Sequence, residues 1–470
     1  MITSAEGGQL IDRVEPGIPP RNSRAGRIFL VIMFITLMLD ALPDFRVGIG
    51  PGLSAKNLYL YSLCILIGAR AVMNPYGLRF VDLHVHIPFL AAILYAFLTL
   101  AISSVYDPMY DTMRGLASLK NKMIDLYLLM FIFRFLVSSR DDFIWLIKAV
   151  VVMMFVSAFL TLIDFVNMPD LGIVGTYKGR IEGPIGGANQ YGSLLAFLLP
   201  ISIGTMPRKP GFARWFWRIG ILITVILLIG TGSRGAYVGM IAGSAAAVVY
   251  MRDYVDLRTV ARMTISALGM ATVLIIAYLM LNPDFLVNLV EKSTTGDLET
   301  ASSGRWAIWG AALGVMLEVP YTFLVGYGWN SFESSGIWKS AHSVYFNHFF
   351  EVGIIGLAIF IILIRNIVQR SRACLKRADD EASILTKSFV ISMFVLAIDI
   401  IFVTPSAAWS VMWILIGLML GLQSTLPHGQ SDTQNASANN DDLSKGSLQT
   451  IGSQVPRTSI AQTRWQGTGI

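Results

Sequence analysis

Four side chains in this sequence can bind an anion or move a proton, and each lies at the edge of an apolar stretch: Arg180, Arg234, Arg305 and His342. A guanidinium keeps its positive charge, and its planar fork of donors suits the oxygens of a carboxylate or a diphosphate. A histidine with a pKa near neutrality can take a proton from a hydroxyl. If the fold brings the four together, they would bind a polyanion beside a proton acceptor.

Each of the four also has a plainer interpretation when it is taken alone. Arg234 lies in the tight turn TGSRGAY, where a snorkelling arginine would cap a hairpin. Arg180 would then be one charge in a glycine-rich loop, and Arg305 a solvated residue in the first turn of a helix. His342 would be a hydrogen-bonded anchor at the start of an apolar stretch. A binding site is favoured only if the fold brings the four residues to one place.

The elements that must position these residues are transmembrane helices. Of the 470 residues, 54% are hydrophobic and only 14% are charged, whereas about a quarter of the residues of a soluble protein are charged. Apolar stretches of roughly 17 to 22 residues, long enough to cross a bilayer, recur along the chain. We predict an all-α polytopic bundle with about twelve spans, near residues 28–43, 56–73, 86–104, 122–138, 143–166, 188–206, 217–232, 235–251, 263–281, 343–364, 388–403 and 406–423.

The basic residues predict how the bundle is oriented. With the N-terminus in the cytoplasm, about 25 of the 36 lysines and arginines lie in or beside inside segments, as the positive-inside rule requires. This orientation puts the segment 1–26, the loop Arg365–Lys387 and the polar tail 424–470, which we expect to be disordered, in the cytoplasm. It puts the loop 282–342, with a short amphipathic helix over Arg305–Glu318, outside. The four candidate residues then share the outer rim of the transmembrane domain, 27–423.

Several function classes are disfavoured by the same pattern. The basic residues fall between spans and not in runs with exposed aromatics, so nucleic acid is not an expected partner. His84 and His86 do not share a helix face, and no cluster completes a metal set, so we predict no metal. We find no phosphate-cradling loop and no nucleotide-binding fold. Three external arginines suit a lipid-linked diphosphate, and a transfer reaction there would draw its energy from a pre-activated lipid carrier.

Four segments in succession resemble the superfamily of O-antigen ligases and Wzy-type polysaccharide polymerases, which are glycan transferases of the bacterial inner membrane. The segments are RIEGPIGGANQYGSLLAFLLP, LIGTGSRGAYVGM, SGRWAIWGAALGVMLEVPYTFLVGYGWNSF and AHSVYFNHFFEVGIIGLAIF, and together they cover about residues 179–364. The family often has Asn after the histidine, whereas here Ser343 follows His342 and Asn347 comes later.

The resemblance implies a GT-C-like architecture with a large periplasmic loop. It also implies transfer of a glycan from an undecaprenyl-diphosphate donor without cofactor, nucleotide or essential metal. Arg180, Arg234 and Arg305 match the arginines that are proposed to hold the donor diphosphate, and His342 matches the proposed general base. Asn189, Ser233 and Glu351 are candidates for supporting roles. A glycan or a lipid A-core would be the acceptor, and chain-length regulators would be partners of a polymerase.

Two other functions stay open at this point. A transporter or flippase for an anionic or lipid-linked solute would also need convergent arginines, although it would need polar residues deep in the spans as well. An assembly partner without catalytic activity would tolerate substitution of all four residues. Within the family, a ligase and a polymerase share every motif quoted above, so the sequence does not separate them.

Overall fold

A computed structural model of the chain describes residues 48–50, 53–73, 83–106, 110–137, 139–165, 176–177, 180–184, 187–254, 304–337, 340–375, 380–404 and 408–425. Two of the predicted spans, 28–43 and 263–281, lie outside the described residues. So do the N-terminal segment 1–26, the tail from residue 426 and residues 282–303 of the predicted external loop.

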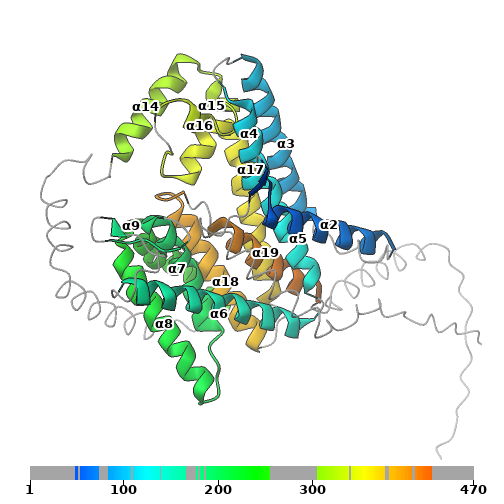
Figure 1. Cartoon of the computed structure of the whole chain (residues 1–470), viewed down its shortest axis with the longest axis vertical. Coiled ribbons are helices and arrows are strands. Elements are labelled where there is room, and N and C mark those ends of the chain that lie inside the picture. The colour runs from blue at the N-terminus through cyan, green and yellow to red at the C-terminus, as the bar shows by residue number, and fades with distance from the viewer. Residues whose placement is uncertain are drawn as a thin grey trace, which may run out of the picture. The chain divides into compact units, whose positions relative to one another are not determined.

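The described chain is mostly helical, because its apolar stretches form helices with only polar segments between them (Figure 1). Each predicted span within the described residues coincides with a helix or a run of helical turns. They are α2 (Ala55–Met73), α3 (Leu83–Tyr106), α5 (Asp125–Leu136), α6 (Arg140–Phe165), α7 (Ala188–Gly204), α8 (Phe212–Thr231), the run of α9 (Arg234–Val238), η4 (Gly239–Gly243) and α10 (Ser244–Tyr250), α17 (Val344–Leu375), α18 (Asp380–Asp399) and α19 (Ala408–Thr425).

Five helices of the described part are long and apolar enough to cross a membrane: α3, α6, α8, α17 and the stretch Glu381–Asp399 of α18. The chain is therefore a helical membrane protein. The described strands are short and form two ladders, β1 (Gly48–Gly50) with β2 (Leu53–Ser54) and β3 (Thr176–Tyr177) with β4 (Arg180–Ile181).

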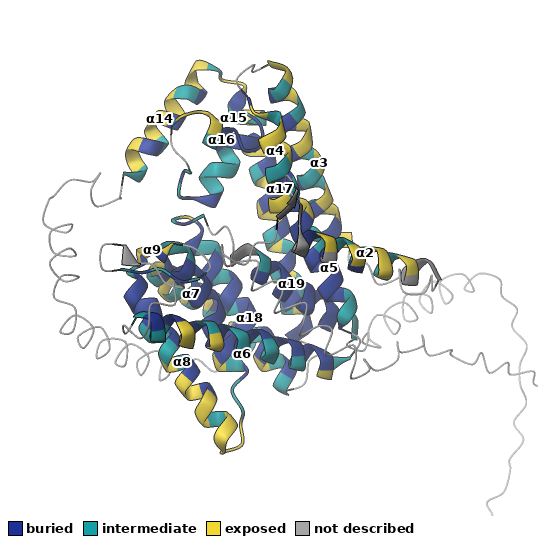
Figure 2. Ribbon diagram, viewed as in Figure 1, coloured by how far each residue is buried: buried dark blue, intermediate teal, exposed yellow. Residues whose placement is uncertain are grey.

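Glycines allow several of these helices to pack closely. A Cβ on Gly417 of α19 would collide with the backbone of Met130 on α5, and a Cβ on Gly243 of η4 would collide with the backbone of Val395 on α18. Small residues let helix backbones approach in a bilayer, where helix packing rests on van der Waals contact. Helix α7, most of whose side chains are buried, packs against α8 and α18 (Figure 2).

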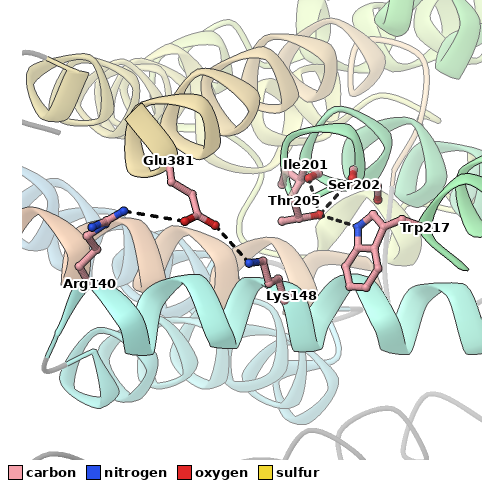
Figure 3. Close-up of polar contacts among 7 residues, drawn as sticks. All are labelled: Arg140, Lys148, Ile201, Ser202, Thr205, Trp217 and Glu381. Carbon is pink, nitrogen blue, oxygen red and sulfur yellow. Dashed lines mark hydrogen bonds and ion pairs between the residues drawn. The ribbon is translucent and has the colours of Figure 1, made fainter. Parts of the chain in front are cut away.

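Polar contacts tie these helices together at one end (Figure 3). Glu381, in the first turn of α18, pairs with Lys148 at 3.1 Å and Arg140 at 3.8 Å, both on α6. Trp217 of α8 donates to the hydroxyl of Thr205, which follows α7, at 3.1 Å. The opposite ends of α7, α8 and α18 carry the residues of the candidate site.

Helix α17 is longer than the sequence predicted. It continues to Leu375, so the first part of the predicted loop Arg365–Lys387 is helical, and α18 begins at Asp380. The stretch from Arg365 to Leu375 has neither glycine nor proline, so nothing stops the helix where its apolar stretch ends. Near its other end, α17 is kinked at Gly353, which has a φ of 63°.

The described part of the external loop contains three short helices: α14 (Arg305–Glu318), α15 (Thr322–Val325) and α16 (Ser331–Ser334). Helix α14 has the bounds that the sequence predicted. Its inner face packs through Ile308, Ala312 and Met316 against a small core that includes Phe332 and Phe350. Gly304, in a left-handed conformation, precedes the helix, and Pro320 follows it.

Candidate functional site

Arg180 is fixed between the start of α7 and the end of α8. It lies on β4, and its Nε donates to the carbonyl of Thr231, the last residue of α8, at 2.7 Å. Its Nη2 donates to Oδ1 of Asn189, in the first turn of α7, at 2.6 Å. A guanidinium has five N–H donors, and these bonds account for two of them. Asn189, a predicted supporting residue, thus aims the side chain of Arg180.

Arg234 begins α9 immediately after the turn that ends α8. Gly232 makes this turn in a left-handed conformation, with a φ of 57°. The Ser233 side chain then caps α9 by accepting from the N–H of Ala236 at 3.5 Å. A Cβ on Gly235 would lie only 2.9 Å from Cβ of Phe402. The glycines therefore permit the predicted tight turn and hold it against α18, while the side chain of Arg234 is exposed.

Arg305 reaches the same region from the external loop. It is half-buried at the start of α14, and its Nη2 donates to the carbonyl of Phe402, just beyond the end of α18, at 3.0 Å. The N-terminus of a helix carries partial positive charge, so an arginine there adds to a positive field instead of cancelling it. An anion would find both contributions favourable.

His342 lies beside the same segment in a strained backbone conformation. Its φ is 53°, which is uncommon for a residue other than glycine and is often found at functional sites. Its N–H donates to Oγ of Ser340 at 3.1 Å, and Ser340 is hydrogen-bonded to Thr404 at 3.2 Å. The N–H of Ala341, the preceding residue, donates to Oδ1 of Asn347 at 3.0 Å. Asn347, in the first turn of α17, therefore holds the backbone of the residue before His342.

The three arginines and His342, which we call the basic cluster, lie close enough to act on one another electrostatically. Burial lowers the pKa of Arg180 and of Arg305, and the positive charge of Arg234 lowers both further. Burial also lowers the pKa of His342, and the charge of Arg305 adds to this effect. The lowered pKa favours the neutral imidazole, which can accept a proton. An anion bound nearby would reduce the repulsion among the positive charges of the arginines.

Glu351, the third predicted supporting residue, belongs to a different group. It is buried on α17, and the backbone N–H groups of Asn330 and Phe332 donate to its carboxylate. Lys122 lies within electrostatic range of it and donates to Oδ1 of Asn330 at 3.1 Å. Ser118 donates to the same oxygen at 2.8 Å. We call Ser118, Lys122, Asn330 and Glu351 the loop anchor.

One acidic residue beside the basic cluster was not identified as part of the site from the sequence. Asp399 is buried at the end of α18, and a Cβ on Gly235 would lie 3.0 Å from its Oδ1. An ionisable residue within a span is a functional candidate in itself, and that signal was visible in the sequence. The sequence did not show that Asp399 lies against the turn that carries Arg234.

Comparison with known families agrees with the resemblance drawn from the motifs. Residues 219–361 match the family model described as O-antigen ligase, which covers α8, α14 and the first half of α17 and includes Arg234, Arg305 and His342. Arg180 and Asn189 lie before the matched region. No curated protein matches the sequence. The match supports assignment to the superfamily of O-antigen ligases and Wzy-type polymerases.

Proposed function

We propose that this chain, which carries an O-antigen ligase domain, transfers a glycan from an undecaprenyl-diphosphate donor to an acceptor hydroxyl at the periplasmic face of the inner membrane. The observation that carries the proposal is the convergence of the basic cluster on the segment after α18. Arg305 donates to the carbonyl of Phe402, and Phe402 lies against Gly235, the residue after Arg234. Thr404 is hydrogen-bonded to Ser340, which accepts from the N–H of His342. A diphosphate beside a reacting hydroxyl is the ligand that this arrangement suits.

The reaction is a metal-independent, inverting displacement. Nε2 or Nδ1 of His342 takes the proton of the acceptor hydroxyl, and the hydroxyl oxygen attacks the anomeric carbon of the donor sugar. The bond from that carbon to the diphosphate oxygen breaks, and undecaprenyl diphosphate leaves with the electron pair. Arg180, Arg234 and Arg305 stabilise the negative charge that develops on the leaving group.

The proposal includes the topology predicted from the sequence. About twelve spans over 27–423 form a GT-C-like bundle, the segments 1–26 and 424–470 are cytoplasmic, and the loop 282–342 is periplasmic. The basic cluster has this use only if the loop faces the periplasm. Labelling of a single introduced cysteine at exposed Gly310 with an impermeant reagent tests the orientation.

The test of the activity is transfer in proteoliposomes from an undecaprenyl-diphosphate-linked oligosaccharide. We expect H342A to lose about 100- to 10,000-fold in rate, because a positioned general base contributes about that much. H84A is the control, since His84 is exposed at the start of α3. Full activity of H342A would refute the mechanism, and anion flux without transfer would favour a transporter.

Analysis of the glycans made by a strain that lacks the gene identifies the acceptor. A strain without the gene should accumulate unligated lipid-linked polymer if the acceptor is a lipid A-core. It should show capped cores without a ladder of chain lengths if the acceptor is another lipid-linked repeat unit.

A further inference from the structure

The segment Gly326–Trp329 of the external loop is inserted at the kink of α17. The N–H groups of Tyr327 and Gly328 donate to the carbonyls of Phe350 and Glu351 at 2.9 and 2.8 Å. These carbonyls immediately precede Gly353, where the helix is interrupted and its own hydrogen bonds are lost. The loop therefore supplies hydrogen-bond donors to two carbonyl groups of α17 beside the kink.

The same segment is also bound by α3 and by Tyr110, two residues before the start of α4 (Thr112–Leu119). The hydroxyl of Ser103 on α3 donates to the carbonyl of Tyr327, and that of Tyr110 donates to the carbonyl of Trp329. A Cβ on Gly328 would collide with Ser103, so the backbone approaches α3 as closely as a glycine allows. Figure 1 shows α15 and α16 of the loop next to α3, α4 and α17.

Asn330 is the residue at which these contacts converge. Its φ of 66° is in the left-handed region, which asparagine tolerates better than most residues. Its side-chain oxygen accepts from Ser118 and Lys122, while its own N–H donates to the carboxylate of Glu351. The side chain is held by Ser118 at the end of α4 and by Lys122 just after it, and the backbone is held by Glu351 of α17.

Lys122 reaches Asn330 from an unusual turn. It lies in the π-helical turn η3 (Lys120–Ile124) between α4 and α5, and such turns are frequent at functional sites. The neighbouring Lys120 points elsewhere and pairs with Asp125 at 3.0 Å. Only Lys122 of these two lysines contributes to the loop anchor, and its charge compensates the buried carboxylate of Glu351.

The loop anchor is connected to the basic cluster through packing. Phe332, two residues after Asn330, and Phe350, next to Glu351, form the core on which α14 rests. Trp309 of α14 donates to the carbonyl of Ala341, the residue before His342, at 2.9 Å. A shift of the anchored segment would therefore move Arg305 relative to His342.

We propose that Lys122 and Asn330 are positioning residues of the glycan-transfer site, which hold the external loop so that α14 presents Arg305 beside His342. Neither residue belongs to the basic cluster, to which we assign the donor and the acceptor. The inference rests on the proposed function, because it assigns Arg305 and His342 to one reaction.

The test compares N330G and K122M in proteoliposomes with an undecaprenyl-diphosphate-linked oligosaccharide. Glycine keeps the left-handed backbone of Asn330 and removes only its side-chain contacts. We expect kcat to fall about 10- to 100-fold, since a misplacement of about 1 Å can cost a factor of about 100. We expect the KM for the donor to change less than kcat. The acid limb of the pH–rate profile should move to higher pH, because Arg305 would no longer hold down the pKa of His342.

Three variants keep the test decisive. K120M removes a lysine from the same turn, and its acid limb should match that of the wild type. K122R should restore most of the activity that K122M loses. S118A removes a single hydrogen bond and should show the same shift in smaller degree even if N330G folds poorly.

A wild-type acid limb and kcat in N330G and K122M would overturn the positioning role. If H342A is inactive in the same preparation, that outcome leaves the proposed function standing. Full activity of H342A would instead remove the proposed function itself.

Discussion

Arg180 precedes α7 and Arg234 follows α8, the next helix in the chain, whereas Arg305 and His342 both come from the external loop 282–342. We call the first pair the bundle half of the site and the second pair the loop half. In the bundle half, Arg180 bonds to Asn189 and to Thr231, and Ser233 caps the next helix. All of these contacts lie at the ends of α7, α8 and α9.

The loop half depends on contacts between distant parts of the chain. Arg305 bonds to the carbonyl of Phe402, and Ser340, which accepts from the N–H of His342, bonds to Thr404. Both halves meet at the segment after α18, where Phe402 also packs against Gly235 of the bundle half. The difference teaches that a site can have one part built into a bundle and another that docks on it.

The largest effect that distinguishes the halves should come from replacing one arginine of each. R305Q and R234Q should both lower the rate of transfer about 100- to 1,000-fold, which is typical for the loss of one donor to a developing negative charge. Only R305Q should change the pH dependence, because the charge of Arg305 lowers the pKa of His342.

The sign of that change follows from the role of the base. His342 acts in its neutral form, so activity is lost as the pH falls through its pKa, which lies below the ordinary 6.5. Without the charge of Arg305 the pKa rises toward 6.5, although burial still lowers it, and the acid limb moves to higher pH. Rates of transfer measured from pH 4 to pH 8 check this prediction. An unshifted acid limb in R305Q would mean that the charge of Arg305 does not act on His342.

The bundle half was easier to predict from the sequence than the loop half. Apolar stretches gave the helices, and Gly232 and Gly235 marked the turn that carries Arg234. Of the loop half, helix α14 was predicted with its bounds. In the structure, Gly304 and Pro320 delimit it, and Ile308, Ala312 and Met316 repeat at helical spacing.

The loop anchor could not be predicted, since its members are distant in the chain and ordinary in type. Lys122 and Asn330 are 208 residues apart. Asn330 lies near the end of one of the motifs quoted from the sequence, but Lys122 belongs to none of them. The kink at Gly353 was equally hidden, because glycines are common in transmembrane helices and only the inserted loop shows which of them bends. Glu351 was singled out from the sequence, but its partners were not.

A smaller effect should separate two glycines, one from each region. In G235A the new methyl group would meet Phe402 at 2.9 Å, whereas a Cβ on Gly310 of α14 has no heavy atom within 4 Å. Overpacking costs about 1–3 kcal/mol, and alanine gains up to about 1 kcal/mol over glycine in a helix. Thermal unfolding in detergent should therefore show a lower Tm for G235A and an unchanged or higher Tm for G310A. Equal Tm values would mean that the turn is not tightly packed on α18.

The smallest effect should come from the exposed ion pair at the edge of the docked loop. Arg114 of α4 pairs with Glu333 of α16 at 2.5 Å, and their side chains are 57% and 34% exposed. Exposed pairs contribute about 0.2–1 kcal/mol, so R114E should lower the rate of transfer less than about 5-fold. The exchange R114E/E333R should restore it, and 0.5 M salt should weaken the effect of R114E. The buried anchor, in contrast, should be insensitive to salt. If R114E lowers kcat as much as N330G does, the exposed ion pair, and not the buried loop anchor, holds the loop half in place.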